Sequence, residues 1–163
     1  MSASNTTDPY RTSMHYRRMQ RLAPFAATSS VAFQSMNSGL VALRVLVVDD
    51  HTDLADSLAT VIEHFGHQAQ TAATGELALA QMEAWAPDLV LVDVGLPDMT
   101  GYEVAQQARM HLWGQAMTLI AMTGWGGIED QKRSVAVGFD QHILKPLDLD
   151  RLRALLDSVR ARI

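Results

Sequence analysis

Apolar residues fall into short continuous runs along this chain, and the runs alternate with segments of helical spacing. The runs at residues 45–48 and 89–92 contain no polar residue, which is typical of strands buried on both faces of a parallel sheet. The pattern predicts strands near residues 43–48, 67–71, 88–93, 117–122 and 140–144. It predicts helices over residues 53–65, 75–85, 101–111, 127–137 and 148–161.

The predicted helices carry apolar stripes that would cover a sheet. Two stripes are clear: Leu54, Leu58, Val61, Ile62 and Phe65, and then Leu149, Leu152, Leu155, Leu156 and Val159. Each helix is long enough to be the crossover that a parallel connection needs. Strand 67–71 is more polar than the others, so we expect it at an edge. The sequence therefore predicts an α/β fold, a doubly wound five-stranded parallel sheet with helices on both faces, in one domain over residues 41–163.

Composition narrows the class of protein. The 163-residue chain has no cysteine, which excludes disulfides and thiolate metal sites and suits a reducing cytosol. Its apolar stretches are too short to cross a membrane, so we expect a cytoplasmic protein without membrane insertion. From residue 43 onward, 17 acidic residues outnumber 9 Lys and Arg. Binding to a phosphate backbone needs clustered basic residues, so direct contact with nucleic acid is not expected.

Residues 1–40 are rich in Ser, Thr, Ala and Met and lack sustained periodicity, so we expect a disordered N-terminal extension. Two other interpretations stay open. Met36 is a possible true start of the protein, and Arg17 and Arg18 precede a mildly apolar stretch that weakly resembles a targeting segment. A short helix over residues 15–22 that docks on the domain or on a partner also stays open. After the last predicted helix we expect no output domain.

Charged and polar residues follow the predicted strands. Asp49 and Asp50 follow the first strand, Asp93 ends the third, Thr123 follows the fourth and Lys145 the fifth. In open α/β sheets, ligands bind at the carboxyl ends of the strands. Carboxylates about 4 Å apart repel by about 4 kcal/mol at an effective dielectric near 20, so this group requires a cation or a shared proton. An all-oxygen ligand set favours Mg²⁺, and the edge could then hold an anion beside a carboxylate nucleophile.

Four segments carry a resemblance to a known family: LRVLVVDD (43–50), LVLVDVGLPDMTGYEVA (89–105), LIAMTG (119–124) and GFDQHILKPLD (138–148). From Leu43 to Ile163 the chain resembles the receiver domain of two-component response regulators of the chemotaxis-regulator type. The resemblance implies a flavodoxin-like sheet of strand order 2-1-3-4-5. It also implies Mg²⁺ or Mn²⁺ as cofactor and a sensor histidine kinase or histidine phosphotransfer protein as phosphoryl donor.

The resemblance further implies a role for each residue at the strand ends. Asp93 would be the phosphoacceptor and a metal ligand. Asp50 would ligate the metal directly, Asp49 mostly through water, and the backbone carbonyl of Gly95 would complete the set. Lys145 would pair with Asp93 and then with the phosphoryl group.

Other implied roles lie in the loops that flank the strand ends. Thr123 would hydrogen-bond a phosphoryl oxygen, and Pro146 would follow a cis peptide bond. Pro97 lies in the expected active-site loop, residues 96–100. Thr100 is the expected N-cap of the following helix, with Glu103 completing a capping box.

The chain departs from the family pattern at the switch position, where an aromatic residue is usual and His142 stands instead. Imidazole titrates near neutrality, so this switch would be sensitive to pH. Gly95 leaves room for an attacking water, whereas Trp125 would cover it, so no phosphoryl lifetime is predicted. Gly124 lies in a glycine-rich loop that we expect to be mobile and to be ordered through Thr123, unless the glycines serve only the backbone turn.

Three outputs stay open: a stand-alone regulator that binds a downstream target protein, which we favour, a phosphorelay intermediate, or a piece of a larger hybrid kinase. The expected target-binding face is formed by the fourth helix, the fifth strand and the fifth helix, with His142, Lys132 and Arg133. Two alternatives are a Mg²⁺-dependent phosphohydrolase and a pseudo-receiver that works without phosphorylation. The first lacks a second carboxylate two residues after its nucleophile, and the second is disfavoured by the complete residue set. Beyond self-phosphotransfer and self-dephosphorylation, no enzyme activity is expected.

Several residues are expected to be structural only. His64 and His67 are predicted to be surface histidines, because nothing near them completes a metal site. His51 either lines the mouth of the site or serves the helix start. Met82, Met99, Met110, Met117 and Met122 are predicted to be mostly core fillers rather than metal ligands.

Overall fold

The computed structural model describes residues 41–124 and 127–163, without the side chains of residues 128 and 129. The expectations for residues 1–40 and for Trp125 therefore lie outside the described residues. The strands are β1 (Arg44–Val48), β2 (Gln68–Ala72), β3 (Leu89–Asp93), β4 (Thr118–Thr123) and β5 (Gln141–Leu144). The helices are α2 (Thr52–His64), α3 (Gly75–Trp85), α4 (Gly101–Met110), α5 (Leu112–Gln115), α6 (Ile128–Ala136) and α7 (Leu149–Arg160).

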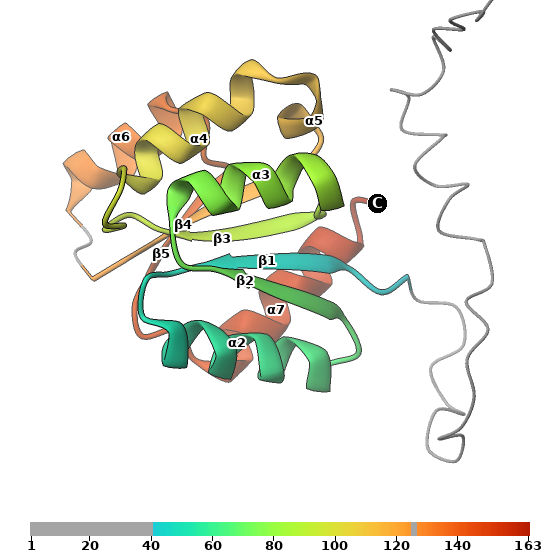
Figure 1. The fold of residues 1–163 in the computed structure, drawn as a ribbon. Helices are drawn as coiled ribbons and strands as arrows, with labels where there is room; N and C mark the ends of the chain where they lie inside the picture. The colour runs from blue at the N-terminus through green and yellow to red at the C-terminus, as the bar shows by residue number, and fades with distance from the viewer. Residues whose placement is uncertain (1–40, 125–126) are drawn as a thin grey trace, which may run out of the picture. The chain divides into compact units, whose positions relative to one another are not determined.

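All five strands pair in parallel in the order β2-β1-β3-β4-β5, which confirms the predicted topology (Figure 1). The polar β2 lies at one edge, as its composition predicted. Alternate residues of the central strands serve opposite faces of the sheet, since side chains alternate along a strand. Val45 and Val47 pack with α2 and α7, whereas Leu46 and Val48 pack with α3 and α4.

Most predicted element bounds agree with the structure within two residues, but the stripes and the region after α4 need corrections. Leu54 lies in the first turn of α2 and Leu149 begins α7; both are more than half exposed, so they do not join the core. Met110 is the exception among the methionines predicted to be mostly core fillers, because it is 73% exposed at the end of α4. The short helix α5, which follows directly, was not predicted.

None of the helices in the described part of the chain is both long enough and apolar enough to cross a membrane.

Candidate functional site

The register of the sheet brings the polar strand ends together. β1 and β3 are neighbours, with Val48 opposite Val92, so Asp49 and Asp93 occupy adjacent positions at the carboxyl edge. β4 and β5 pair with Thr123 opposite Leu144, which places Lys145 just beyond that pair. Parallel pairing therefore assembles the site from residues almost a hundred positions apart in the sequence.

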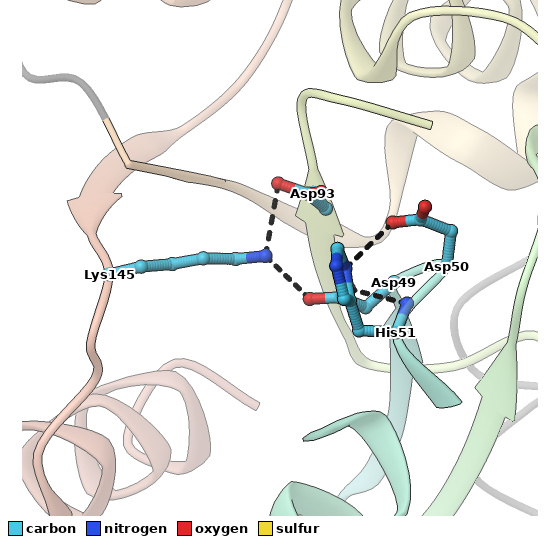
Figure 2. Close-up of polar contacts among 5 residues, drawn as sticks. All are labelled: Asp49, Asp50, His51, Asp93 and Lys145. Carbon is cyan, nitrogen blue, oxygen red and sulfur yellow. Dashed lines mark hydrogen bonds and ion pairs between the residues drawn. The ribbon is translucent and has the colours of Figure 1, made fainter. Parts of the chain in front are cut away.

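Lys145 joins the two buried carboxylates of this edge (Figure 2). Its Nζ lies 2.6 Å from Oδ2 of Asp49 and 3.1 Å from Oδ1 of Asp93. The side chain of Asp49 is 1% exposed and that of Asp93 is 12% exposed. Burial alone would lower the pKa of Lys145, but its hydrogen bonds to both aspartates and their negative charges raise it overall. Lys145 is therefore an ammonium ion at neutral pH.

Asp49 and Asp50 form a second contact with His51, which stands at the N-cap position of α2. The backbone N–H of His51 donates to Oδ1 of Asp49 over 3.0 Å. The imidazole Nδ1 lies 3.3 Å from Asp49 Oδ1 and 3.1 Å from Asp50 Oδ1, and the side chain is 75% exposed (Figure 2). The imidazole makes no capping bond and contacts the two carboxylates instead, whereas the backbone carbonyl of His51 accepts the N–H groups of Leu54 and Ala55 at the helix start.

The donor set fits a hard divalent cation. Ligand atoms of Asp49, Asp50 and His51 all lie within 4.8 Å of one another, and two of these residues offer carboxylate oxygens. Asp93 is not a member of that group of three, but its carboxylate is held to the same lysine as Asp49. A Cβ built on Gly95 would lie 3.7 Å from Oδ2 of Asp93, so the backbone of Gly95 runs beside that carboxylate.

Thr123, Gly124 and the loops lie around this group. Thr123 is buried at the end of β4, and its carbonyl accepts a hydrogen bond of 2.8 Å from the Lys145 backbone N–H. Gly124 is exposed and has open space around it, and the following residues are not described. Pro97 is exposed in the β3–α4 loop. The Lys145–Pro146 peptide bond is cis, as the resemblance implied.

His142 points toward α6 rather than into solvent. Its Nδ1 lies 3.0 Å from Oγ of Ser134, a buried residue of α6. The Ser134 hydroxyl donates to the Asp130 carbonyl over 2.8 Å, so its oxygen accepts from Nδ1–H of His142. Nε2 of His142 is enclosed and has no hydrogen-bond partner within the described part of the chain.

Comparison with known proteins decides the family. Residues 45–157 match the family described as response regulator receiver domain. The chain belongs to this family. The predicted membership in two-component signal transduction is thereby confirmed.

Curated relatives of this receiver domain are longer proteins. The virulence sensor protein BvgS of Bordetella pertussis is 31% identical over 157 residues, which are 93% of this chain and 12% of BvgS. The probable transcriptional regulatory protein TcrX of Mycobacterium tuberculosis is 34% identical over 118 residues, 70% of this chain and 50% of TcrX. The chain thus spans about an eighth of the one relative and half of the other.

Solved receiver structures share the fold. The chemotaxis response regulator CheY4 of Vibrio cholerae is 28% identical with a TM-score of 0.69, and the match covers 73% of this chain and 99% of CheY4. A CheY-like receiver domain protein of Methanospirillum hungatei is 30% identical with a TM-score of 0.65, over 76% of this chain and all of that one.

Sequence reasoning missed one residue in the loop beside the receiver site. The carboxylate of Asp98, in the β3–α4 loop, accepts hydrogen bonds from the backbone N–H groups of Gly75 (2.9 Å) and Glu76 (3.0 Å) at the start of α3. The bond from Gly75, followed by the one from Glu76, lowers the pKa of Asp98. The partners are more than 20 residues away, so no local motif could have revealed them.

Arg109 and His67 have structural roles at the other end of the sheet, where the strands begin. Arg109 donates to the carbonyls of Gly114 and Met117 and to the carboxylate of Asp140, at 2.6, 2.9 and 2.6 Å. The prediction that His67 is a surface residue was wrong. It is 8% exposed, and its Nδ1 accepts the backbone N–H of Leu43 over 3.1 Å.

Proposed function

We propose that the receiver domain, over residues 41–163, is phosphorylated on Asp93 and thereby switches a protein-binding surface. The observation that carries the proposal is the position of the Lys145 ammonium, which bonds to both Asp93 and Asp49. An ammonium at this place neutralises the acceptor carboxylate before reaction and can pair with a phosphoryl oxygen afterwards. The exposure of Asp93, though small, leaves a path to its carboxylate from the edge of the sheet.

The proposed donor is a phosphohistidine of a sensor histidine kinase or a histidine phosphotransfer protein. A carboxylate oxygen of Asp93 attacks the phosphorus, the P–N bond breaks, and its electron pair returns to the imidazole nitrogen of the donor. The product is an acyl phosphate on Asp93. Lys145 stays protonated throughout, because its pKa is raised, and Thr123 supplies a hydroxyl donor to a phosphoryl oxygen.

We assign the divalent cation, Mg²⁺ or Mn²⁺, to Asp49, Asp50, Asp93 and the carbonyl of Gly95. When bound, it would offset the negative charge that otherwise repels a phosphate from the three aspartates. The imidazole of His51 contacts both Asp49 and Asp50, so it would have to turn away when the cation binds. Its largely exposed side chain allows this movement.

The proposed readout runs from Thr123 to His142 and α6. β4 and β5 are paired neighbours, with Thr123 opposite Leu144. A movement of Thr123 toward a phosphoryl group would therefore shift the backbone of β5 as well. His142 of β5 bonds to Ser134 of α6, which links the strand to the face formed by α6, β5 and α7. That face also exposes Val135, Leu144 and Leu149, apolar side chains suited to binding a downstream target protein.

The test is the intact mass of the protein after incubation with acetyl phosphate and Mg²⁺. We expect one phosphoryl adduct in the wild type, none in Asp93→Asn, none with EDTA, and an unchanged adduct in Asp53→Asn, which removes an exposed carboxylate of α2 instead. If no adduct forms, beryllofluoride binding distinguishes a site that hydrolyses its phosphoryl group too fast to detect from a site that accepts no phosphoryl group. A wild type that binds no beryllofluoride would be a pseudo-receiver, and the proposal would be abandoned.

A further inference from the structure

The β3–α4 loop, residues 94–100, begins and ends against the backbone of β3. The N–H of Gly101 donates to the Val94 carbonyl over 3.0 Å, and a Cβ on Gly101 would lie only 2.3 Å from the carbonyl oxygen of Asp93. Thr100 and Glu103 form a reciprocal capping box that fixes the start of α4. The two ends of the loop are therefore held, and its middle requires a separate anchor.

Asp98 is that anchor, and it attaches the loop to a helix outside the proposed site. Its two oxygens accept the N–H groups of Gly75 and Glu76 at 2.9 and 3.0 Å, the first two donors of α3. α3 already has its own N-cap, since the Thr74 side chain accepts from Leu77 N–H over 3.2 Å. Asp98 thus satisfies two donors that the local cap leaves free, with a favourable charge at the positive end of the helix.

Packing supports the same attachment. A Cβ on Gly75 would lie 2.4 Å from Cγ and 2.8 Å from Sδ of Met99, the residue that follows Asp98. The loop therefore approaches the α3 backbone as closely as a glycine allows. Hydrogen bonds and close packing together make the start of α3 and the middle of the loop one unit.

Only two residues separate Asp98 from Gly95, whose backbone lies beside the Asp93 carboxylate. A chain of three peptide steps spans at most about 10–11 Å, so the place of Asp98 limits where the Gly95 carbonyl can lie. We propose that Asp98 is a positioning residue for the cation site, because it holds the β3–α4 loop on α3 and so presents the Gly95 carbonyl next to Asp93. This inference rests on the proposed function, which assigns the Gly95 carbonyl to the cation.

The experiment is a calorimetric titration of the full chain with MgCl₂, without phosphoryl donor, at about 0.15 M KCl, where charges more than about 8 Å apart are largely screened. We expect Asp98→Ala to bind Mg²⁺ about tenfold more weakly than the wild type, the lower limit typical for residues that orient metal ligands. Asp98→Asn keeps one acceptor oxygen and should bind Mg²⁺ with an affinity between those of Asp98→Ala and the wild type, which gives a variant with one bond intact if the alanine variant does not fold.

Two matched variants separate positioning from other effects. Thr74→Ala removes the local cap of the same helix without touching the loop, so it should lower the unfolding midpoint and leave Mg²⁺ affinity within about twofold. Asp53→Asn removes one exposed negative charge from α2 and should also leave the affinity within about twofold.

The outcomes distinguish this inference from the proposed function. A wild type that gives no Mg²⁺ heat and no phosphoryl adduct overturns the proposed function itself. If the wild type binds Mg²⁺ and both Asp98→Ala and Asp98→Asn bind it with the same affinity as the wild type, only the role of Asp98 is overturned. An equal loss of affinity in Asp98→Ala and Thr74→Ala would also overturn it, because the effect would then come from the stability of α3.

Discussion

Replacement of Lys145 by methionine should destabilise the domain substantially. The ammonium donates to Asp49 over 2.6 Å and lies 3.1 Å from Asp93, and the side chain of Asp49 is almost fully buried. Methionine retains an apolar side chain of similar length but leaves the two carboxylates facing each other without a cation. The folded state then contains two uncompensated charges that the unfolded chain exposes to water.

The magnitude follows from these contacts. A hydrogen bond to a charged group contributes about 1.5–3 kcal/mol, and removal of one partner from a buried ion pair costs about 3–5 kcal/mol. The Lys145 side chain is 23% exposed, so water replaces part of what is lost. We therefore expect the free energy of unfolding to fall by about 3 kcal/mol at neutral pH in the presence of EDTA.

Urea denaturation followed by far-UV circular dichroism measures this loss. Arg162→Met serves as the control, because it removes a positive charge from an exposed residue near the end of the chain and should change stability by less than about 0.5 kcal/mol. Adding Mg²⁺ should stabilise Lys145→Met more than the wild type, since a cation there no longer competes with the ammonium. A Lys145→Met protein within about 0.5 kcal/mol of the wild type in EDTA would refute the view that this ion pair neutralises the buried carboxylates.

Two other predictions concern a buried histidine and a close glycine contact. Burial, then the charge of Arg160, lowers the pKa of His67 from 6.5, so the unfolded chain takes up the proton first as the pH falls. The contribution of His67 to stability should thus be fully present above pH 6.5 and decline below it. Urea midpoints should therefore fall less steeply with decreasing pH in His67→Gln than in the wild type or in His64→Gln. Equal slopes of midpoint against pH in all three proteins would contradict this. Gly101→Ala should cost about 1–3 kcal/mol and weaken phosphorylation, because the new Cβ would lie 2.3 Å from a carbonyl oxygen of β3. Gly124→Ala, with nothing within 4 Å, is its control for stability, and equal stability of the two variants would show that the contact relaxes without effect.

The strands could be predicted because the signal of each one is local, whereas the strand order came from the family resemblance. Uninterrupted Val, Ile and Leu runs occur where both faces of the strand are buried, and β1 and β3 are nearly solvent-free. The capping box at Thr100 and Glu103 was likewise readable, since its two bonds join residues three apart. Features of this kind depend on neighbours in the sequence.

What the sequence did not reveal depends on contacts across the fold. In the sequence, His67 resembles a surface histidine. In the fold, the backbone N–H of Leu43, just before β1, donates to its ring. Helix α5 contains Gly114, where a Cβ would lie 1.9 Å from the Ala108 carbonyl oxygen, so the short helix depends on a close approach to the end of α4 that helix propensity does not indicate. The pair formed by Ser134 and His142 also arises only when α6 packs on β5.

The geometry around Lys145 further bears on how the metal and the phosphoryl group would affect each other. In the structure the ammonium is closer to Asp49 than to Asp93, 2.6 Å against 3.1 Å. A phosphoryl group on Asp93 adds negative charge beside the same ammonium and would draw it away from Asp49. Asp49, buried and acidic, then needs another positive partner, and the divalent cation is the partner that we assign to it. Cation binding and phosphorylation should therefore favour each other, and by linkage the effect must be equal in both directions.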